Sequence, residues 1–314
     1  MIVTVTANPS LDRTVGLREA LRPGEVQTAA SVREDAGGKG INVTRVLRGS
    51  GADSVAVLPL DADDPFALVL RAAGVPTAAV AMHGAARANL TIADPAGVTT
   101  KVNLPGVERS AADGAALIDA VVAASRGARW LVLAGSLPPG LPDSFYVDVI
   151  GAVRAASDTP PRVAVDTSGA ALRAVVDAGL ADLIKPNDDE LAELAGVALD
   201  RAMPLPEAVA AVAASLVPSQ VRAAFVTLGG AGAVLVTAQG VWHGSPPPTR
   251  VRSTVGAGDS SLAGFLLAES HGADAQECLR SGIRYGSAAA ALPGTQAPTP
   301  ADLLAGDVPV RTIP

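Results

Sequence analysis

Short runs of β-branched and apolar residues alternate with longer Ala-rich stretches along most of the chain. We expect strands at the apolar runs, which are residues 2–6, 55–58, 130–134, 163–166, 183–185, 225–228 and 233–237. The stretches between them have apolar residues at helical spacing and predict helices at residues 41–48, 65–73, 111–125, 145–156, 170–178, 190–195, 207–216 and 260–270. Strands that alternate with helices are typical of an α/β fold whose doubly wound, mostly parallel sheet has helices on both faces.

Two segments interrupt this alternation. Residues 14–35 and 88–103 contain alternating polar and apolar residues and turn residues, without a convincing helix. They predict the strands of a small second sheet lying over the main one, and a lid is the simplest use for such a sheet. We therefore expect a single domain over residues 1–314, with a lid formed by these two insertions.

Composition and charge narrow the class of protein. The 314 residues are 49% hydrophobic with a mean hydropathy of +0.34, so the chain can bury a large core. A net charge of −7 gives no basic field for nucleic acid, so any phosphate must meet a few placed lysines or arginines. One cysteine and three histidines exclude a disulfide framework and most Cys/His metal sites. Without a leader pattern or a long apolar span, we expect a cytoplasmic protein with no membrane partner.

A tight turn opens the predicted helix at residues 260–270. Its sequence is Thr-Val-Gly-Ala-Gly-Asp, in which Gly256, Ala257 and Gly258 leave backbone N–H groups uncovered at the positive end of the helix dipole. Such a turn can hold a phosphoryl group. Asp259 is then placed to act as a general base for an attacking hydroxyl, although an acid at this position can also serve only as a helix cap.

A second glycine-rich motif, Gly-Gly-Lys-Gly-Ile-Asn at residues 37–42, leads into the first predicted helix. Lys39 and Asn42 are spaced to face one ligand, and Arg87 is a natural partner for Lys39 if that ligand is anionic. The motif is not a Walker loop, because no glycine lies five residues before Gly38 and no Ser or Thr follows Lys39. The glycines could instead only allow close packing of a loop on the helix.

Polar turns follow several predicted strands, at the end where open parallel sheets place their sites. These turns are residues 8–12, 135–140, 166–169, 185–190 and 229–232. Each alone is ordinary turn chemistry. Together they indicate a site along one edge of the sheet.

The motifs at residues 37–42 and 254–259 resemble the two signatures of the PfkB family of carbohydrate kinases, which have the ribokinase-like fold. The resemblance is closest to the family's 1-phosphofructokinase branch and continues through residues 8–12, 135–140, 166–169, 185–187 and 293–295. It implies a sugar-phosphate kinase that transfers the γ-phosphoryl group of ATP to the 6-hydroxyl of D-fructose 1-phosphate. The product is fructose 1,6-bisphosphate. It also implies that the lids of two copies could pair across a homodimer.

The same resemblance implies roles for individual residues. Asp259 is the catalytic base, and the anion hole is formed by Gly256, Ala257 and Gly258. The sugar phosphate is bound by Asp12, Gly37, Gly38, Lys39, Asn42, Arg87 and Ser136. ATP lies along Lys185, Asn187, Thr227, Gly229 and Gly232. Mg²⁺, which prefers oxygen ligands and keeps several waters, is held through water by Glu190 and Asn187.

Departures from the family pattern bear on the substrate. Leu104 stands where 1-phosphofructokinases commonly have a glutamate, and residues 59–64 replace a glycine-rich turn. Lys39 and Glu25 differ from the 6-phosphofructokinase members, which have a glycine and a lysine at these places. Both of these differences favour the 1-phosphate. The main alternative is phosphorylation of fructose 6-phosphate or tagatose 6-phosphate on the same scaffold. A non-catalytic sugar-phosphate sensor is a further alternative, which the complete Asp259 turn disfavours.

Overall fold

The computed structural model describes residues 1–96 and 98–314. The strands of its main sheet are β1 (Ile2–Val5), β4 (Ser54–Leu60), β5 (Thr77–Ala81), β8 (Trp130–Ala134), β9 (Arg162–Asp166), β10 (Leu183–Ile184), β11 (Ala223–Thr227), β12 (Ala233–Thr237), β13 (Gly240–Gly244) and β14 (Val310–Thr312). Among the described residues they form one ten-stranded sheet in the order β14-β13-β12-β11-β10-β9-β8-β1-β4-β5. The strands from β11 to β5 pair in parallel, and β12, β13 and β14 continue the sheet in antiparallel pairs.

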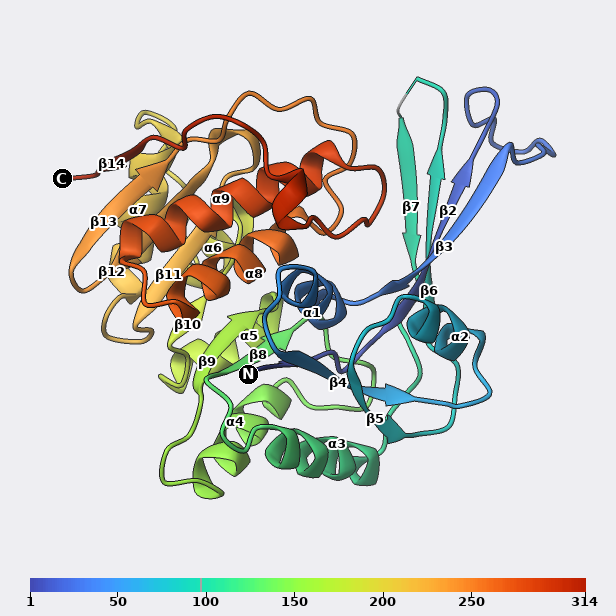
Figure 1. Cartoon of the computed structure of the whole chain (residues 1–314), viewed down its shortest axis with the longest axis horizontal. Helices are drawn as coiled ribbons and strands as arrows, with labels where there is room; N and C mark the ends of the chain where they lie inside the picture. The colour runs from blue at the N-terminus through green and yellow to red at the C-terminus, as the bar shows by residue number, and fades with distance from the viewer. Residues whose placement is uncertain (97) are drawn as a thin grey trace.

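Helices cover both faces of this sheet (Figure 1). One face is covered by α3 (Ala111–Ala124), α4 (Phe145–Ala155), α5 (Gly169–Asp177), α6 (Asp188–Ala195) and α7 (Leu205–Leu216). The other face is covered by α1 (Lys39–Gly49), α8 (Ala257–Ser270) and α9 (Ala275–Ala291). Neighbouring strand residues enter different cores, as Leu131 packs on the first face and Val132 on the second. The central strands are therefore largely apolar, because both of their faces are buried.

A second sheet stands beside the main body (Figure 1). In the described residues it has four strands in the order β3-β2-β6-β7, which are β2 (Ser10–Gly16), β3 (Ser31–Gly37), β6 (Arg87–Ala93) and β7 (Thr99–Asn103). Helix α2 (Pro65–Ala72) packs at its base, where Phe66 and Leu70 share a small core with Ala36 of β3. The small sheet thus arises from the two segments that interrupt the strand and helix alternation, although β2 begins earlier than expected. Residue 97, in the second of these segments, lies outside the described residues.

The predicted fold class is confirmed: the sheet is mostly parallel, has helices on both faces and carries a separate small sheet. Each strand and helix expected from the apolar pattern is present. The pattern missed β5, β13, β14 and the long helix α9. In the described part of the chain, no helix combines the length and apolar character needed to cross a membrane.

Candidate active site

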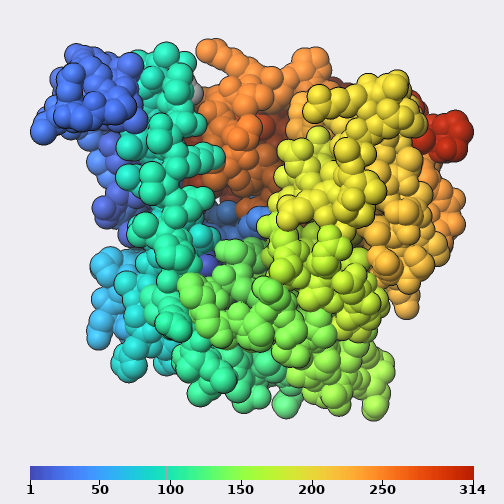
Figure 2. All heavy atoms as spheres, turned by 180° about the vertical axis from the view of Figure 1, so that it is seen from behind, coloured from blue at the N-terminus to red at the C-terminus, as the bar shows by residue number. Residues whose placement is uncertain are grey.

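The two sheets bound a hollow at the carboxyl ends of the parallel strands. Figure 2 shows it between the small sheet, in blue and teal, and the orange part of the chain that includes the turn before α8. Helix α1 begins at the floor of this hollow, directly after β3 of the small sheet. Residues of both glycine-rich motifs and of the turns after the strands therefore meet here.

Asp259 lies in the first turn of α8, whose start is set by Gly256. This glycine is in the left-handed region, with φ 75° and ψ 0°, a conformation that other residues adopt only with strain. Asp259 is 7% exposed, and its Oδ2 accepts a 2.8 Å hydrogen bond from Nδ2 of Asn42 on α1. The carboxylate is thus held by a second helix, which a cap serving only α8 does not require.

Burial raises the pKa of Asp259 to about 6. The nearby carboxylate of Asp166 contributes to this rise, while Lys39, the hydrogen bond from Asn42 and Lys185 act in the opposite direction. A carboxylate that titrates close to neutral pH is suited to accept a proton from a hydroxyl.

Asp166, at the end of β9, joins two lysines beside this base. Its fully buried carboxylate binds Nζ of Lys39 at 2.7 Å through Oδ1 and Nζ of Lys185 at 3.2 Å through Oδ2. Burial disfavours its charge, but the two ammonium groups hold the pKa of Asp166 below its usual range. Burial likewise opposes protonation of Lys39, yet Asp166 and Asp259 raise its pKa above the usual value, so Lys39 is charged. The sequence singled out the turn that contains Asp166 but assigned this residue no role.

Arg87 lies at the base of the small sheet. It begins β6, and its Nη1 donates to the carbonyl oxygen of Leu104 at 3.3 Å. In the described part of the chain, Lys39 and Arg87 share no hydrogen-bond or ion-pair partner, since Lys39 binds Asp166. Burial lowers the pKa of Arg87, and Asp12 partly offsets this. Its Nε is buried without a partner among the described residues, so this guanidinium can still bind an anion.

Close packing explains the glycines at the start of α1. A Cβ on Gly37 would lie 2.3 Å from Oδ2 of Asp12, and one on Gly40 would lie 2.7 Å from the carbonyl oxygen of Val5. Gly38 has a φ of 130°, which favours glycine. The glycines therefore allow the loop to pack closely on the helix, and the same packing brings Asp12 against the motif.

Asp12 is held from its own strand and from the strand beside it. Its Oδ1 accepts hydrogen bonds from Oγ of Ser10 at 2.8 Å and from Nδ2 of Asn89 at 2.9 Å. Burial raises the pKa of Asp12, whereas these two hydrogen bonds lower it. Nearby, Nδ2 of Asn8 lies 3.4 Å from Oγ of Ser136, which brings the turn after β8 to the same edge of the sheet.

A pocket of about 620 Å³ lies on the other side of the Asp259 turn. Its lining includes four of the residues assigned to ATP, which are Asn187, Thr227, Gly229 and Gly232. Ala257 and Gly258 of the turn also line it, so the pocket and the base share one element. The sequence did not predict the part of the lining formed by residues 246–249 and by Gly286, Ser287 and Ala290 of α9. The volume lies within the usual range for small-molecule sites.

Asn187 and Glu190 form a reciprocal cap at the start of α6. Oδ1 of Asn187 accepts from the backbone N–H of Glu190 at 2.8 Å, and Oε2 of Glu190 accepts from that of Asn187 at 2.9 Å. The described residues contain no group of three or more His, Cys, Asp or Glu side chains that could hold a metal ion. Glu190 also helps to raise the pKa of Lys39, so its charge lies near the Asp166 cluster. An ion bound mostly through water needs only such a small set of protein oxygens.

Lys185, which the sequence assigned to ATP, does not line the pocket and instead reaches the turn that contains Asp259. Its Nζ lies 3.2 Å from the place that a Cβ on Gly258 would occupy, so a glycine there leaves room for the ammonium group. The N–H of Ala257 donates to the carbonyl oxygen of Thr254 at 3.4 Å, so the uncovered N–H groups of the turn are those of Gly256 and Gly258. These groups, two lysines and a buried carboxylate lie together between the pocket and the hollow. This arrangement can stabilise negative charge while a proton is removed.

Comparison of the sequence and of the fold with known proteins points to one family of kinases. Residues 6–302 match the pfkB family carbohydrate kinase. The chain is 35% identical over 323 residues to 1-phosphofructokinase from Rhodobacter capsulatus, which covers 100% of this chain and 98% of that protein. It is 33% identical to ATP-dependent 6-phosphofructokinase isozyme 2 from Escherichia coli K12, with 94% of each chain covered. Among solved structures it is similar to Escherichia coli phosphofructokinase-2 in complex with substrates and products, with a TM-score of 0.86, 31% identity and 96% of each chain covered.

Proposed function

Because the chain belongs to the pfkB family of carbohydrate kinases, we propose that it transfers the γ-phosphoryl group of ATP to the 6-hydroxyl of fructose 1-phosphate, with fructose 1,6-bisphosphate as product. The observation that carries this proposal is the position of Asp259. Its buried carboxylate lies between the nucleotide pocket, which Ala257 and Gly258 line, and Asn42 on the floor of the hollow. A base at this point can reach a hydroxyl of one substrate while the turn holds the phosphoryl group of the other.

Positioning and electrostatics account for most of the reaction. Asp259 accepts the proton of the 6-hydroxyl while the hydroxyl oxygen of the sugar attacks the γ-phosphorus of ATP. ADP leaves with the electrons of the broken P–O bond. The N–H groups of Gly256 and Gly258 stabilise charge on the transferring group. Lys39 and Lys185, which Asp166 holds in place, add two positive charges at the same point.

The nucleotide side fits ATP with Mg²⁺. Thr227, Gly229 and Gly232 line the pocket together with Asn187, and Nζ of Lys185 lies beside Gly258, which also lines it. Asn187 and Glu190 are the residues that would hold Mg²⁺ through water, since Glu190 keeps one carboxylate oxygen outside the cap. The ion, when bound, neutralises part of the phosphate charge.

The sugar side is formed by residues of α1 and of the small sheet. Asp12 accepts hydrogen bonds from sugar hydroxyls, while Asn42 and the backbone at Gly37 and Gly38 lie beneath the ring. Arg87, with its unpaired Nε, anchors the existing phosphate a whole ketose away from Asp259. Ser136 completes this side, next to Asn8.

The small sheet acts as a lid in this proposal. It carries Asp12 and Arg87 at its base, so its closure over the sugar would exclude water and limit wasteful ATP hydrolysis. The sheet also exposes Val32 and Val102, at 59% and 49%, and these residues support a homodimer formed through the lid. Escherichia coli phosphofructokinase-2 has a tetrameric inhibited form, which shows that a relative of similar structure assembles.

Phosphorylation of a 6-phosphate is the second candidate. It is favoured by the similarity to 6-phosphofructokinase isozyme 2 and to phosphofructokinase-2 of Escherichia coli. Lys39 and Glu25 instead favour the 1-phosphate, as do the relatives named 1-phosphofructokinase from Rhodobacter capsulatus, Xanthomonas campestris and Vibrio cholerae. A sensor without catalysis would not need a base with its pKa raised to about 6 next to an anion-binding turn.

Incubation of the purified protein with ATP, Mg²⁺ and fructose 1-phosphate tests the proposal. We expect ADP and fructose 1,6-bisphosphate in equal amounts, because each proton removed by Asp259 accompanies one transfer. ADP without a phosphorylated sugar would show hydrolysis only. An absence of product from every ketose phosphate tried would contradict a kinase.

A further inference from the structure

Asn89 lies on β6 directly opposite Asp12 on β2, at the base of the small sheet. Its Nδ2 donates to Oδ1 of Asp12 at 2.9 Å and to Oγ of Ser10 at 3.0 Å. An ionised carboxylate can only accept hydrogen bonds, so the NH₂ group of the amide must face Asp12. The orientation of the Asn89 side chain is therefore fixed, with Oδ1 pointing elsewhere.

That Oδ1 atom is buried and has no hydrogen-bond partner among the described residues. The same is true of Oδ1 of Asn42, whose Nδ2 donates to Asp259 at 2.8 Å. Buried polar atoms are nearly always paired, because an unpaired one keeps its full desolvation cost. The site thus contains two Asn–Asp pairs of the same kind, and each leaves one buried acceptor available.

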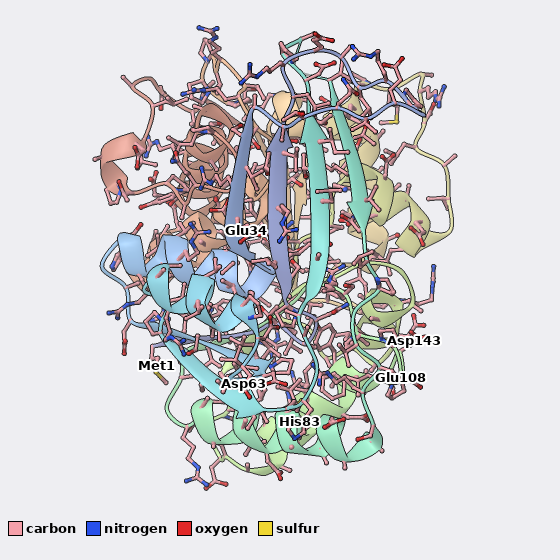
Figure 3. All side chains as sticks on the ribbon, turned by 90° about the vertical axis from the view of Figure 1, so that its right-hand side faces the viewer. Met1, Glu34, Asp63, His83, Glu108 and Asp143 are labelled. Atoms are coloured by element: carbon pink, nitrogen blue, oxygen red, sulfur yellow. The ribbon has the colours of Figure 1, made fainter. Side chains whose placement is uncertain are left out.

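Strand geometry places Asn89 on the side of the small sheet that bears the site. Side chains of residues directly opposite each other in a ladder share a face, so Asn89 lies on the same face as Asp12. Arg13 and Glu34 are the next pair along and bind each other at 2.7 Å on the opposite face, on which Figure 3 looks. Neighbouring strands are about 5 Å apart, so Asp12 and Asn89 can both reach one sugar ring.

We propose that Asn89 binds and positions the sugar: its Nδ2 orients the carboxylate of Asp12, and its Oδ1 accepts a hydrogen bond from a second hydroxyl of the ketose phosphate. The inference rests on the proposed function, because it assumes a sugar in the hollow between Asp12 and Asp259. Oδ1 of Asp12 already accepts two protein hydrogen bonds, which leaves Oδ2 for one hydroxyl. Asn89 then recognises another. A site built from two acceptors selects against sugars that lack either donor.

Replacement of Asn89 by alanine tests this assignment. Asn89→Ala should raise the KM for the sugar phosphate by about ten- to a hundredfold, the value of one or two buried hydrogen bonds. The KM for ATP should not change, and kcat should change far less than the sugar KM, because Asp259 and the nucleotide pocket are untouched. A wild-type KM for the sugar would overturn the proposal.

The matched control is Ser10→Ala. Ser10 also donates to Oδ1 of Asp12, at 2.8 Å, but it offers no unpaired buried acceptor. The 3-deoxy and 4-deoxy forms of the sugar phosphate each lack one hydroxyl, and one of them lacks the donor to Oδ1 of Asn89. Wild type and Ser10→Ala should both bind that deoxy sugar about tenfold or more weakly than the parent sugar. Asn89→Ala should show no such loss. If it keeps the wild-type sensitivity to both deoxy sugars, Asn89 only supports the fold.

Two further choices keep the test decisive. Asn89→Leu keeps the size of the side chain and replaces the alanine variant if that variant does not fold, and calorimetric titration of the sugar phosphate then gives the affinity directly. The deoxy sugars are made from the ketose phosphate that the wild-type protein phosphorylates best. A wild-type protein without kinase activity refutes the proposed function. An active protein whose Asn89 variants keep the wild-type sugar affinity refutes the role of Asn89 alone.

Discussion

The carboxylate of Asp259 is kept in a place that disfavours its charge. Burial and Asp166 raise its pKa from 3.8 to about 6, so its protonated form is favoured in the folded protein relative to the unfolded chain. Protonated Asp259 therefore favours folding at low pH. This contribution to stability is lost as the pH rises from 3.8, the pKa in the unfolded chain, through about 6, the pKa in the folded protein. At neutral pH this group therefore destabilises the free protein, by up to about 3 kcal/mol for a shift of this size.

Asp259→Asn should consequently separate activity from stability. The amide keeps the size of the side chain but cannot accept a proton, so kcat should fall by about two to four orders of magnitude. The free energy of unfolding at pH 8 should rise, because no buried charge has to be maintained. Steady-state kinetics and urea unfolding measure the two effects. Near wild-type turnover would exclude Asp259 as the base.

The same residue sets the expected pH dependence. The free enzyme needs Asp259 ionised, so kcat/KM for the sugar should rise as the pH increases through about 6 and should fall about tenfold per unit below it. Asp259→Asn should lose this step, although its residual rate is low. A wild-type profile that stays flat between pH 5 and 7 would show that another group limits the reaction.

Lys39 and Arg87 should give different kinetic defects. The sequence motifs suggested that both bind one phosphate, but Lys39 binds Asp166 beside Asp259, whereas Arg87 lies at the start of β6. Arg87→Ala should raise the KM for the sugar phosphate about ten- to a hundredfold, while Lys39→Ala should mainly lower kcat. Lys101→Ala, which removes an exposed positive charge from β7, is the control. Equal rises in KM for both variants would restore the original grouping.

Individual site residues were predictable where a local motif carries them. Asp259, Gly256 and Asn42 belong to short patterns whose turn and helix chemistry can be read directly from the sequence. Asp166 and Asn89 were not assigned, because their roles depend on partners far away in the chain. Lys39 is 127 residues from Asp166, and Asn89 is 77 residues from Asp12, so only the fold brings them together.

At the scale of elements, α9 shows why helix propensity was misleading. The helix contains Gly282 and Gly286, which lower its intrinsic propensity. A Cβ at these positions would lie 2.7 Å from Cζ of Phe225 and 2.1 Å from Oγ of Ser261, so the glycines allow close packing on β11 and α8. Tertiary packing therefore stabilises a helix that the local sequence does not favour, and this helix lines the nucleotide pocket.

The turn before α8 depends on one glycine conformation. Gly256→Ala forces a side chain into the left-handed region at φ 75°, which costs about 1–2 kcal/mol even though space around it is open. Because the turn also holds the phosphoryl group, kcat should fall as well. Gly151→Ala, in the exposed middle of α4 with open space around it, should instead stabilise by about 0.5–1 kcal/mol. Thermal unfolding of both variants checks this, and an unchanged Gly256→Ala protein would contradict the role given to the turn.

At the scale of the whole molecule, the site exists only where two sheets meet. The main sheet contributes the anion-binding turn, the buried Asp166 cluster and the nucleotide pocket, and the small sheet contributes Asp12, Asn89 and Arg87. The apolar pattern predicted both sheets because the buried central strands and the irregular insertions look different in sequence. It missed β5 at one end of the main sheet and β13 and β14 at the other, which extend a sheet that other strands already define.

The choice of sugar is the central claim of the proposed function. In that proposal Arg87 anchors the existing phosphate at the small sheet and Asp259 meets the reacting hydroxyl at the main sheet, so a ketose 1-phosphate would bridge them with its free 6-hydroxyl toward the base. The most direct measurement is kcat/KM for fructose 1-phosphate, fructose 6-phosphate and tagatose 6-phosphate, side by side with ATP and Mg²⁺. We predict the highest value for fructose 1-phosphate. An equal or higher value for either 6-phosphate would contradict this account.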